Sequence, residues 1–327
     1  MPSISIITPF YNSADTIKEY LTSIFGSAYK DFELIIVDDG SERQCAQLFE
    51  GYPVVFKKLN QRKGAYYARN RGVEMAKGRL LLFLDADVIV RPDTLGRIAA
   101  VFDGHPEVSG LIGSYDDSPG PRNTVTQFKF LCHHFIHQQE GEYVGSFWTG
   151  CGAIKKDVFN ELGGFNLDSL WNAIMDIDLG YRLRLSGHKI YNAKNIQVKH
   201  LKKLTFADWI YTDIFHRGLP WIKIMLQYKD FRPTLNVSTT GVANVVYVWL
   251  MLAISVLGAF NEKGLVFLPV LFGVFLISNH RLLSFFRAKR GFLFALKAFF
   301  LLLIYNFNCG LCVLLGLVLY RRECFIE

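Results

Sequence analysis

Two aspartates separated by one residue carry the clearest chemistry in this chain. Asp85 and Asp87 follow the segment Arg79–Leu84, whose apolar run predicts a strand buried on both faces. At the carboxyl end of such a strand, the two carboxylates would face the crevice where open α/β sheets bind ligands. Carboxylates spaced i, i+2 can hold a hard divalent cation, with water and a phosphate-bearing substrate in its remaining positions. The alternative is a solvent-exposed turn that carries two acidic side chains. The motif alone does not decide between this turn and a cation site.

The elements that must position these aspartates alternate in type along the first part of the chain. Strands are expected at 5–8, 33–37, 53–59 and 79–84, and helices at 14–25 and 64–76. This alternation predicts an α/β domain with a mostly parallel sheet and helices on both faces. Because the carboxyl ends of parallel strands meet at one edge, the polar residues after successive strands should line one crevice.

Two further clusters on these elements suit a nucleotide. Asp38 and Asp39 end the second strand, and at least one of them could accept hydrogen bonds from a base or a ribose. Alternatively, the turn after them starts a helix with Ser41 as its N-cap. Arg69 lies on the buried side of the helix at 64–76. A buried guanidinium needs an anionic partner, and a nucleotide diphosphate is a natural one.

The hydrophobic content of 51% is concentrated in the last third of the chain. Almost wholly apolar runs occupy 241–260, 264–277 and 292–320. The first and last reach the roughly 20 residues that span a bilayer, and the middle one suffices if its flanks join it. We therefore expect a transmembrane region over 236–327. Before it, residues 206–235 mix aromatic side chains with cations, which favours amphipathic helices in the membrane interface over a core helix.

Charge predicts the orientation of this region. The connection at 281–290 carries Arg281, Arg287, Lys289 and Arg290, whereas the connection at 261–263 is short and nearly neutral. The positive-inside rule places the basic connection in the cytoplasm. The chain enters its first strand without a signal peptide, so we expect a cytoplasmic catalytic domain on a cell inner membrane. We therefore expect the net charge of +7 to favour binding to anionic headgroups and phosphate substrates, and not to nucleic acid.

The last apolar run conflicts with this rule. As one helix, residues 292–320 would extend about 43 Å, more than the hydrocarbon core of about 30 Å. A single tilted crossing would leave Arg321 and Arg322 outside. A hairpin broken at 306–310 would keep them inside, but its arms are too short to cross fully. We favour the single tilted crossing, because asparagines can hydrogen-bond to neighbouring helices.

Four motifs occur in the order and spacing of one enzyme family. They are Thr8–Asn12, Val37–Ser41, Gly64-x-x-x-Ala68-Arg69-Asn70-x-Gly72 and Leu84–Asp87, followed by 150–154, 163–165 and 176–183. In these motifs the chain resembles the membrane-anchored family 2 glycosyltransferases. The resemblance implies a GT-A fold, a Rossmann-like nucleotide-diphospho-sugar transferase domain over 1–205, with the interfacial helices and transmembrane helices after it.

The resemblance also implies the reaction. A hexosyl group would pass from a nucleotide-diphospho-sugar, bound through Mg²⁺ or Mn²⁺, to an acceptor that attacks from the opposite face, with inversion. The protein then supplies positioning, leaving-group stabilisation and a base. A lipid or lipid-linked acceptor at the membrane and a role in cell envelope glycan biosynthesis are expected. A homo-oligomer is left open.

Site residues are assigned by the same resemblance. Asp176 is the candidate base, although the family often has Glu-Asp where this chain has Met175-Asp176. The candidate nucleotide-sugar ligands are Pro9, Tyr11, Asn12, Asp38, Asp39, Lys63, Arg69, Asp85 and Arg217. The candidate metal ligands are Asp85, Asp87 and His200, and the candidate acceptor-side residues are Gly150, Cys151, Gly152 and Trp221. Arg217 and Trp221 resemble a Gln-x-x-Arg-Trp motif, but the altered spacing and missing glutamine argue against a processive synthase.

Two alternatives remain open beside a glycosyltransferase. A nucleotidylyltransferase would use a similar fold and metal, but it should carry a Gly-rich loop with Arg and Lys after the first strand, where this chain has Pro9-Phe10-Tyr11-Asn12. A non-catalytic nucleotide-sugar-binding membrane protein is disfavoured by the intact Asp85, Asp87 and Asp176.

Overall fold

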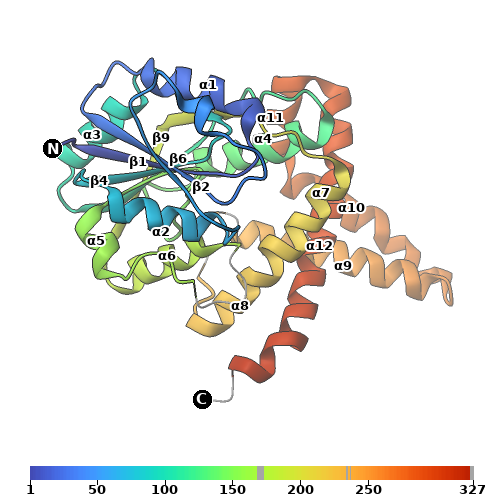
Figure 1. The fold of residues 1–327 in the computed structure, drawn as a ribbon. Coiled ribbons are helices and arrows are strands. Elements are labelled where there is room, and N and C mark those ends of the chain that lie inside the picture. Colours follow the sequence, from blue (N-terminus) through green and yellow to red (C-terminus); the bar gives the residue numbers. More distant parts are fainter. Residues whose placement is uncertain (168–172, 233–234, 236, 325–327) are drawn as a thin grey trace. The chain divides into compact units, whose positions relative to one another are not determined.

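A mostly parallel sheet forms the centre of the first of two units, residues 1–121 and 136–203 (Figure 1). In this computed structural model, which describes residues 1–167, 173–232, 235 and 237–324, the strand order is β3-β2-β1-β4-β8-β6-β9-β5, with β7 paired to β9. The strands are β1 Ile4–Phe10, β2 Phe32–Asp38, β3 Val54–Lys58, β4 Leu80–Leu84, β5 Val88–Ile89, β6 Val108–Tyr115, β7 Tyr143–Val144, β8 Cys151–Lys155 and β9 Lys189–His200. The predicted α/β sheet is confirmed.

Helices cover both faces of the sheet, as the alternating pattern predicted. α1 (Ala14–Phe25) and α3 (Thr94–Gly104) lie on one face, and α2 (Ala65–Met75), α5 (Lys156–Glu161) and α6 (Met175–Leu185) lie on the other (Figure 1). A short 3₁₀ helix, η1, covers Ala46–Phe49. On the second face, the rings of Phe83, Phe147, Phe159 and Phe165 pack edge to face or tilted against one another. This aromatic core anchors α5 and the turn after it to the sheet.

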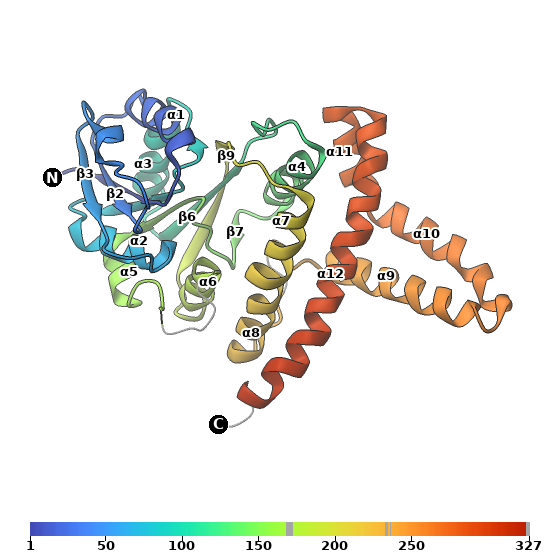
Figure 2. The same ribbon diagram turned by 45° about the vertical axis from the view of Figure 1, so that its right-hand side comes forward.

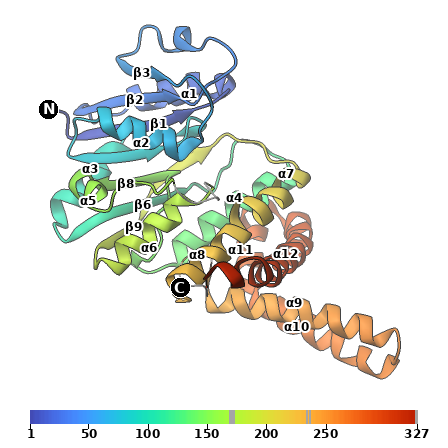
Figure 3. The ribbon, with the colours of Figure 1, turned by 60° about the horizontal axis from the view of Figure 1, so that its bottom comes forward.

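The strand directions bring the functional loops to one edge. β1 is parallel to β2 and β4, and β6 is parallel to β9. β8 runs antiparallel to β4, with Leu84 opposite Cys151, so β8 begins where β4 ends. The loops after β1, β2, β4, β6 and β9 and the segment before β8 therefore share this edge, which Figure 3 shows from another side.

The second unit, residues 122–135 and 204–327, is helical. Its elements are α7 Phe206–Tyr211, the π-helix η2 Thr212–Gly218, α8 Leu219–Tyr228, α9 Thr239–Gly258, the 3₁₀ helix η3 Glu262–Val266, α10 Phe267–Ser278, α11 His280–Arg290 and α12 Phe292–Cys324. It also takes most of α4 (Thr124–Gln139), whose last turn belongs to the first unit. Its core gathers Phe128, Trp209, Phe275, Phe286 and Phe299.

Two described helices, α9 and α12, are long and apolar enough to cross a membrane. A third candidate combines Glu262–Ser278 with His280–Arg290, but the two halves are bent by 64°. Helix α12 runs through 306–310 without a break (Figure 2), so the predicted hairpin alternative is wrong. Large apolar side chains are exposed along α9, α10 and α12, as expected for helices that contact lipid.

Candidate active site

Asp39 links the turn after β2 to the segment before α2. Its Oδ1 accepts a hydrogen bond from the Lys63 amide and its Oδ2 one from the Gly64 amide, both at 2.8 Å. Gly40 has a φ of +78°, and a Cβ there would lie 2.7 Å from the Arg62 nitrogen, so the turn requires glycine. The Asp39 carboxylate thus organises the two loops that border the predicted nucleotide site.

The Asp38 side chain points into the protein and stabilises the same turn through hydrogen bonds. Its carboxylate is fully buried and accepts hydrogen bonds from the Ser41 amide at 2.9 Å and the Cys45 thiol at 3.0 Å. Lys58 lies 3.9 Å from it. The sequence left open which of the two aspartates faces the crevice, and these contacts give Asp38 a purely internal set of partners.

The loop after β1 completes this edge. Asn12 adopts a φ of +49°, and its amide donates to the Ser41 hydroxyl at 3.0 Å. Tyr11 lies under the Arg62 guanidinium, 4.3 Å from ring centroid to Cζ, and Pro9 sits at the end of β1 opposite Val37. The Tyr11 ring and its cation therefore offer a flat surface and a positive charge beside the Asp39 loops.

Asp85, Asp87 and His200 form one cluster at the ends of β4 and β9. One ligand atom from each lies within 4.8 Å of the others, and this is the single such cluster among the residues that the structure describes. Oδ1 of Asp87 is buried and has no hydrogen-bond partner, and it lies 3.6 Å from His200 Nε2, beyond hydrogen-bonding distance. An orphaned carboxylate oxygen of this kind is costly and suits a cation.

Arg69 offsets part of the negative charge at this cluster. Its Nη2 donates to Asp85 Oδ1 at 2.5 Å, and its side chain is 4% exposed. Burial raises the pKa of the Asp85 and Asp87 carboxyls, and the nearby Arg69 guanidinium acts in the opposite direction on both. The sequence predicted an anionic partner for Arg69, and in this structure that partner is a protein carboxylate.

The His200 ring is held by the chain that follows it. Its Nδ1 accepts a hydrogen bond from the Lys202 amide at 3.0 Å, so a neutral ring carries its hydrogen on Nε2, which faces Asp87. Ligation of a metal through Nε2 therefore requires the Lys202 contact to open. The two carboxylates fit Mg²⁺ or Mn²⁺ without such a change, because hard divalent ions take oxygen ligands.

Asp176 lies in the first turn of α6 and is held against the segment before β8. Its Oδ2 accepts hydrogen bonds from both the amide and the hydroxyl of Thr149 at 3.1 Å, and its Oδ1 accepts one from the Ile177 amide at 2.9 Å. Burial, followed by the charge of Asp176, raises the pKa of Tyr66 well above its usual value, so Tyr66 stays a donor. Tyr66 also hydrogen-bonds to Asp176, so three neighbouring residues orient this carboxylate.

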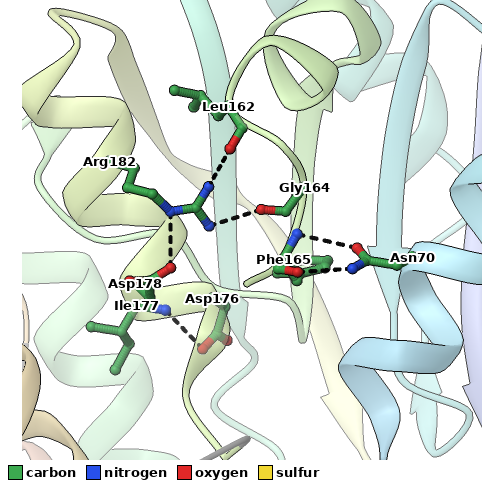
Figure 4. Close-up of polar contacts among 8 residues, drawn as sticks. All are labelled: Asn70, Leu162, Gly164, Phe165, Asp176, Ile177, Asp178 and Arg182. Carbon is green, nitrogen blue, oxygen red and sulfur yellow. Dashed lines mark hydrogen bonds and ion pairs between the residues drawn. The ribbon is translucent and has the colours of Figure 1, made fainter. Parts of the chain in front are cut away.

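Asp178 has a structural role two residues further along α6. It accepts a hydrogen bond from Arg182 Nε at 2.9 Å. The other guanidinium nitrogens of Arg182 donate to the carbonyls of Leu162 at 2.7 Å and Gly164 at 2.8 Å (Figure 4). The Asp178–Arg182 pair therefore fastens α6 to the turn after α5.

The same turn is fastened from the other side by α2. The Asn70 side chain exchanges two hydrogen bonds with the Phe165 backbone, at 2.8 Å and 3.1 Å (Figure 4). Since Arg69 precedes Asn70 on α2 and Asp176 lies in the first turn of α6, this double clamp fixes the helix that holds Asp85 relative to the helix that carries the candidate base.

Gly150 and Gly152 make room for neighbouring aromatic rings. A Cβ on Gly150 would collide with the Trp148 indole, and one on Gly152 would come within 2.9 Å of the Phe147 ring. Trp148 then packs edge to face on Tyr115, with ring centroids 4.7 Å apart. Cys151 between the glycines is fully buried. Trp148 is half-buried, whereas the two glycines beside Cys151 are buried.

Gly180 lets α6 approach the segment before β8 closely. A Cβ there would lie 2.8 Å from the Ser146 Cα, which is backbone and cannot move aside. Gly180→Ala should therefore lower stability by about 1–3 kcal/mol and reduce kcat by displacing Asp176 from Thr149. Thermal unfolding and initial rates test this. Gly104→Ala in α3, where a Cβ meets nothing within 4 Å, is the control and should lower neither quantity, since alanine is the better helix former; equal losses in the two variants would contradict the prediction.

Arg217 and Trp221 belong to the second unit and are described within it. Arg217 Nη1 lies 3.6 Å from Asp213 Oδ1, and its side chain is half exposed. The indole nitrogen of Trp221 is buried without a hydrogen-bond partner. Their predicted contacts with the diphosphate and the acceptor stay predictions.

Sequence reasoning missed two residues that contact Asp176, and a third, Trp148, that packs against Gly150. Thr149 holds Asp176 through two hydrogen bonds, and it directly precedes the recognised Gly150 motif. Tyr66 lies three residues before Arg69 on α2, the helical spacing that could have placed both on one face. Trp148 had no signal beyond being aromatic.

Comparison with known proteins agrees with this geometry. Residues 5–163 match the model of the family described as Glycosyl transferase family 2. The chain is 29% identical over 203 residues to the poly-beta-1,6-N-acetyl-D-glucosamine synthase of Staphylococcus aureus, covering 58% of this chain and 48% of that protein. It is 39% identical over 117 residues to a PGL/p-HBAD biosynthesis glycosyltransferase of Mycobacterium tuberculosis, covering 34% and 45%.

A solved structure extends the likeness in fold. The mannosyltransferase PcManGT from Pyrobaculum calidifontis, in complex with GDP-Man and Mn²⁺, superposes with a TM-score of 0.56 at 16% identity, covering 96% of this chain and 87% of that one. The chain spans less than half the length of the first curated relatives that it matches. The order of the motifs, the α/β sheet and the family match agree, and residues 5–163 form a glycosyl transferase family 2 domain.

Proposed function

We propose that this protein is a metal-dependent, inverting glycosyltransferase that moves a hexosyl group from a nucleotide-diphospho-sugar to a lipid or lipid-linked acceptor at the cytoplasmic membrane face. One observation carries the proposal. Asp85 binds Arg69 at 2.5 Å, the Arg69 guanidinium lies 4.9 Å from the Tyr66 ring, and Tyr66 lies against Asp176. The candidate metal site and the candidate base are thus joined through neighbouring residues of α2.

The donor would lie across the ends of β1, β2 and β4. Asp39 and the Tyr11–Arg62 pair border the position expected for the base and ribose. Asp85 and Asp87 would hold Mg²⁺ or Mn²⁺, which when bound neutralises the charge that develops on the diphosphate. Arg69 adds positive charge next to them, and the Lys63 ammonium lies over the Tyr67 ring of the same helix. This arrangement favours departure of the nucleoside diphosphate.

The acceptor would approach from the side of Asp176. Its hydroxyl oxygen forms the new bond to the anomeric carbon, the bond from that carbon to the diphosphate oxygen breaks, and the hydroxyl proton passes to Asp176 Oδ1. Thr149 keeps the carboxylate in place by occupying Oδ2, as general-base catalysis requires. Trp148, packed on Tyr115, offers a ring beside this position.

The second unit supports a membrane-borne acceptor. Helices α9 and α12 have the length and apolar character of membrane segments, and the basic residues of α11 favour the cytoplasmic side for that helix. An enzyme held at the bilayer surface meets lipid acceptors at high local concentration.

Membranes that contain the protein should transfer label from one nucleotide sugar of a panel into the lipid extract, and chelation of Mn²⁺ and Mg²⁺ should stop the transfer. Membranes with the Asp87→Ala variant are the matched control. Retained nucleotide-sugar binding without transfer from any donor would favour a non-catalytic protein. Formation of pyrophosphate from a nucleoside triphosphate and a sugar phosphate would favour a nucleotidylyltransferase.

A further inference from the structure

One face of α2 carries three polar side chains that reach three different parts of the candidate site. Tyr66, Arg69 and Asn70 are spaced i, i+3 and i+4, so they lie on the same face of the helix. Asn70 binds the turn after α5, and Arg69 binds Asp85. The Tyr66 hydroxyl hydrogen-bonds to Asp176. Two of these contacts hold the turn and the candidate metal site, and the third reaches the candidate base.

The Tyr66 ring is fixed by its neighbours. Its centroid lies 5.1 Å from that of the Phe165 ring, at an angle of 57°, and 4.9 Å from Cζ of Arg69. Both neighbours are anchored in turn. Asn70 exchanges two hydrogen bonds with the Phe165 backbone, and Arg69 donates to Asp85. Because a tyrosine side chain has two rotatable angles and this ring is packed, its hydroxyl has little freedom to move.

α2 is itself held close to the sheet and to the neighbouring turn. A Cβ on Gly72 would come 2.5 Å from the Ile7 side chain in β1, so the close approach of α2 to the sheet needs a glycine. Figure 4 shows α2 with Asn70 on one side of the turn at Phe165, and α6 on the other. A side chain on this face of α2 therefore meets the first turn of α6 at a fixed place.

The Asp176 carboxylate receives donors from three elements. Thr149, before β8, donates its amide and its hydroxyl to Oδ2, and Ile177, in α6 itself, donates its amide to Oδ1. Tyr66 adds a donor from α2, the helix that also holds Asp85. Burial and the charge of Asp176 raise the pKa of Tyr66 well above its usual value, so the phenol keeps its proton at neutral pH and remains a donor.

We propose that Tyr66 is a positioning residue for glycosyl transfer, whose hydroxyl holds the Asp176 carboxylate in the orientation in which it takes the proton of the acceptor hydroxyl. The inference rests on the proposed function, with Asp176 as the base. A purely structural tyrosine is the alternative, since buried tyrosine hydroxyls usually find a hydrogen-bond partner. That alternative predicts a loss of stability without an effect on the chemical step.

Tyr66→Phe removes the hydroxyl and keeps the ring with its packing. We expect kcat with a hydroxyl acceptor to fall by about 10- to 100-fold, the size expected for one hydrogen bond to a charged group. The KM for the nucleotide sugar should stay near that of the wild type. Tyr67→Phe on the same helix is the matched control and should leave kcat unchanged, because the Tyr67 ring lies against the Lys63 and Arg71 side chains and Phe keeps that ring. Nucleotide-sugar binding by each variant counts the folded sites, so that a lower yield of folded protein is not taken for a lower kcat.

A double-mutant cycle with Asp176→Asn separates positioning from a structural role. If Tyr66 acts through Asp176, Tyr66→Phe should change the residual kcat of Asp176→Asn by less than about 2-fold, because no base remains to be oriented. Equal fold losses in the two backgrounds would overturn the inference, as would a loss confined to the KM for the nucleotide sugar.

The single variants distinguish failure of the inference from failure of the proposed function. A normal kcat in Asp176→Asn with a hydroxyl acceptor would refute the base, and the role of Tyr66 with it. A normal kcat in Tyr66→Phe beside an impaired Asp176→Asn would refute the role of Tyr66 alone and leave the base in place.

Discussion

Asp87→Ala is expected to lower sugar transfer by about 10³-fold or more, equivalent to roughly 4 kcal/mol of transition-state stabilisation. The orphaned Asp87 oxygen and its place within 4.8 Å of Asp85 and His200 are the reason. Loss of this ligand removes the cation that would neutralise the leaving diphosphate. Initial rates across a Mn²⁺ titration measure the effect, and near-normal rates at any metal concentration would refute the assignment.

Thermal unfolding separates loss of the metal site from loss of the fold. Burial raises the pKa of Asp87 above its value in the unfolded chain. The folded protein therefore binds more protons than the unfolded chain, and the free energy of unfolding falls as the pH rises through the raised pKa. At neutral pH, Asp87→Ala should therefore be at least as stable as the metal-free wild type. Added Mn²⁺ should raise the Tm of the wild type and not of the variant. Asp103→Ala, which removes an exposed surface ion pair, is the control and should behave as wild type.

Asp176→Asn should lower kcat by roughly 10²–10⁴-fold with a hydroxyl acceptor, the usual range for loss of a general base. The amide keeps the size of the side chain and an oxygen for the Thr149 donors, but it cannot take the proton. The KM for the nucleotide sugar should hardly change. An effect confined to that KM would show that Asp176 positions the donor.

Two comparisons sharpen this test. Asp178→Asn on the same helix weakens the Arg182 contact at 2.9 Å, so it should lower the Tm while leaving the kcat of the folded protein near normal. A phosphate acceptor is already anionic at neutral pH and needs little help from a base. If the natural acceptor is a polyprenyl phosphate, Asp176→Asn should therefore cost far less with it than with a sugar hydroxyl.

The sequence predicted the elements of the first unit well because apolar runs and helical periods are local signals. The helix expected at 14–25 is α1, and the strands expected at 33–37 and 79–84 are β2 and β4 within one residue at either end. Motif order then predicted which loops meet, because the carboxyl ends of parallel strands share an edge.

Contacts between segments that are distant along the chain could not be predicted from the sequence. Residues 122–135 pack in the second unit, where Lys129 binds Asp213, and no local pattern pairs residues 84 positions apart. Arg69 shows the same limit at the site. Its burial predicted an anionic partner, but the choice of Asp85 depended on the fold. The stacking of Trp249 in α9 on Phe307 in α12 likewise depends on the tertiary fold.

The Arg69–Asp85 pair has a consequence for the order of ligand binding. The cluster combines the Arg69 guanidinium, the two carboxylates and a neutral His200. Its net charge is therefore about −1, compared with −2 for the carboxylates alone. Its attraction for a free divalent ion is correspondingly weaker. A bound divalent ion would make the net charge positive, and an incoming diphosphate would be attracted to it. Ion and donor would then raise each other's affinity by the same factor, and the cation would be held most tightly when the nucleotide sugar is bound.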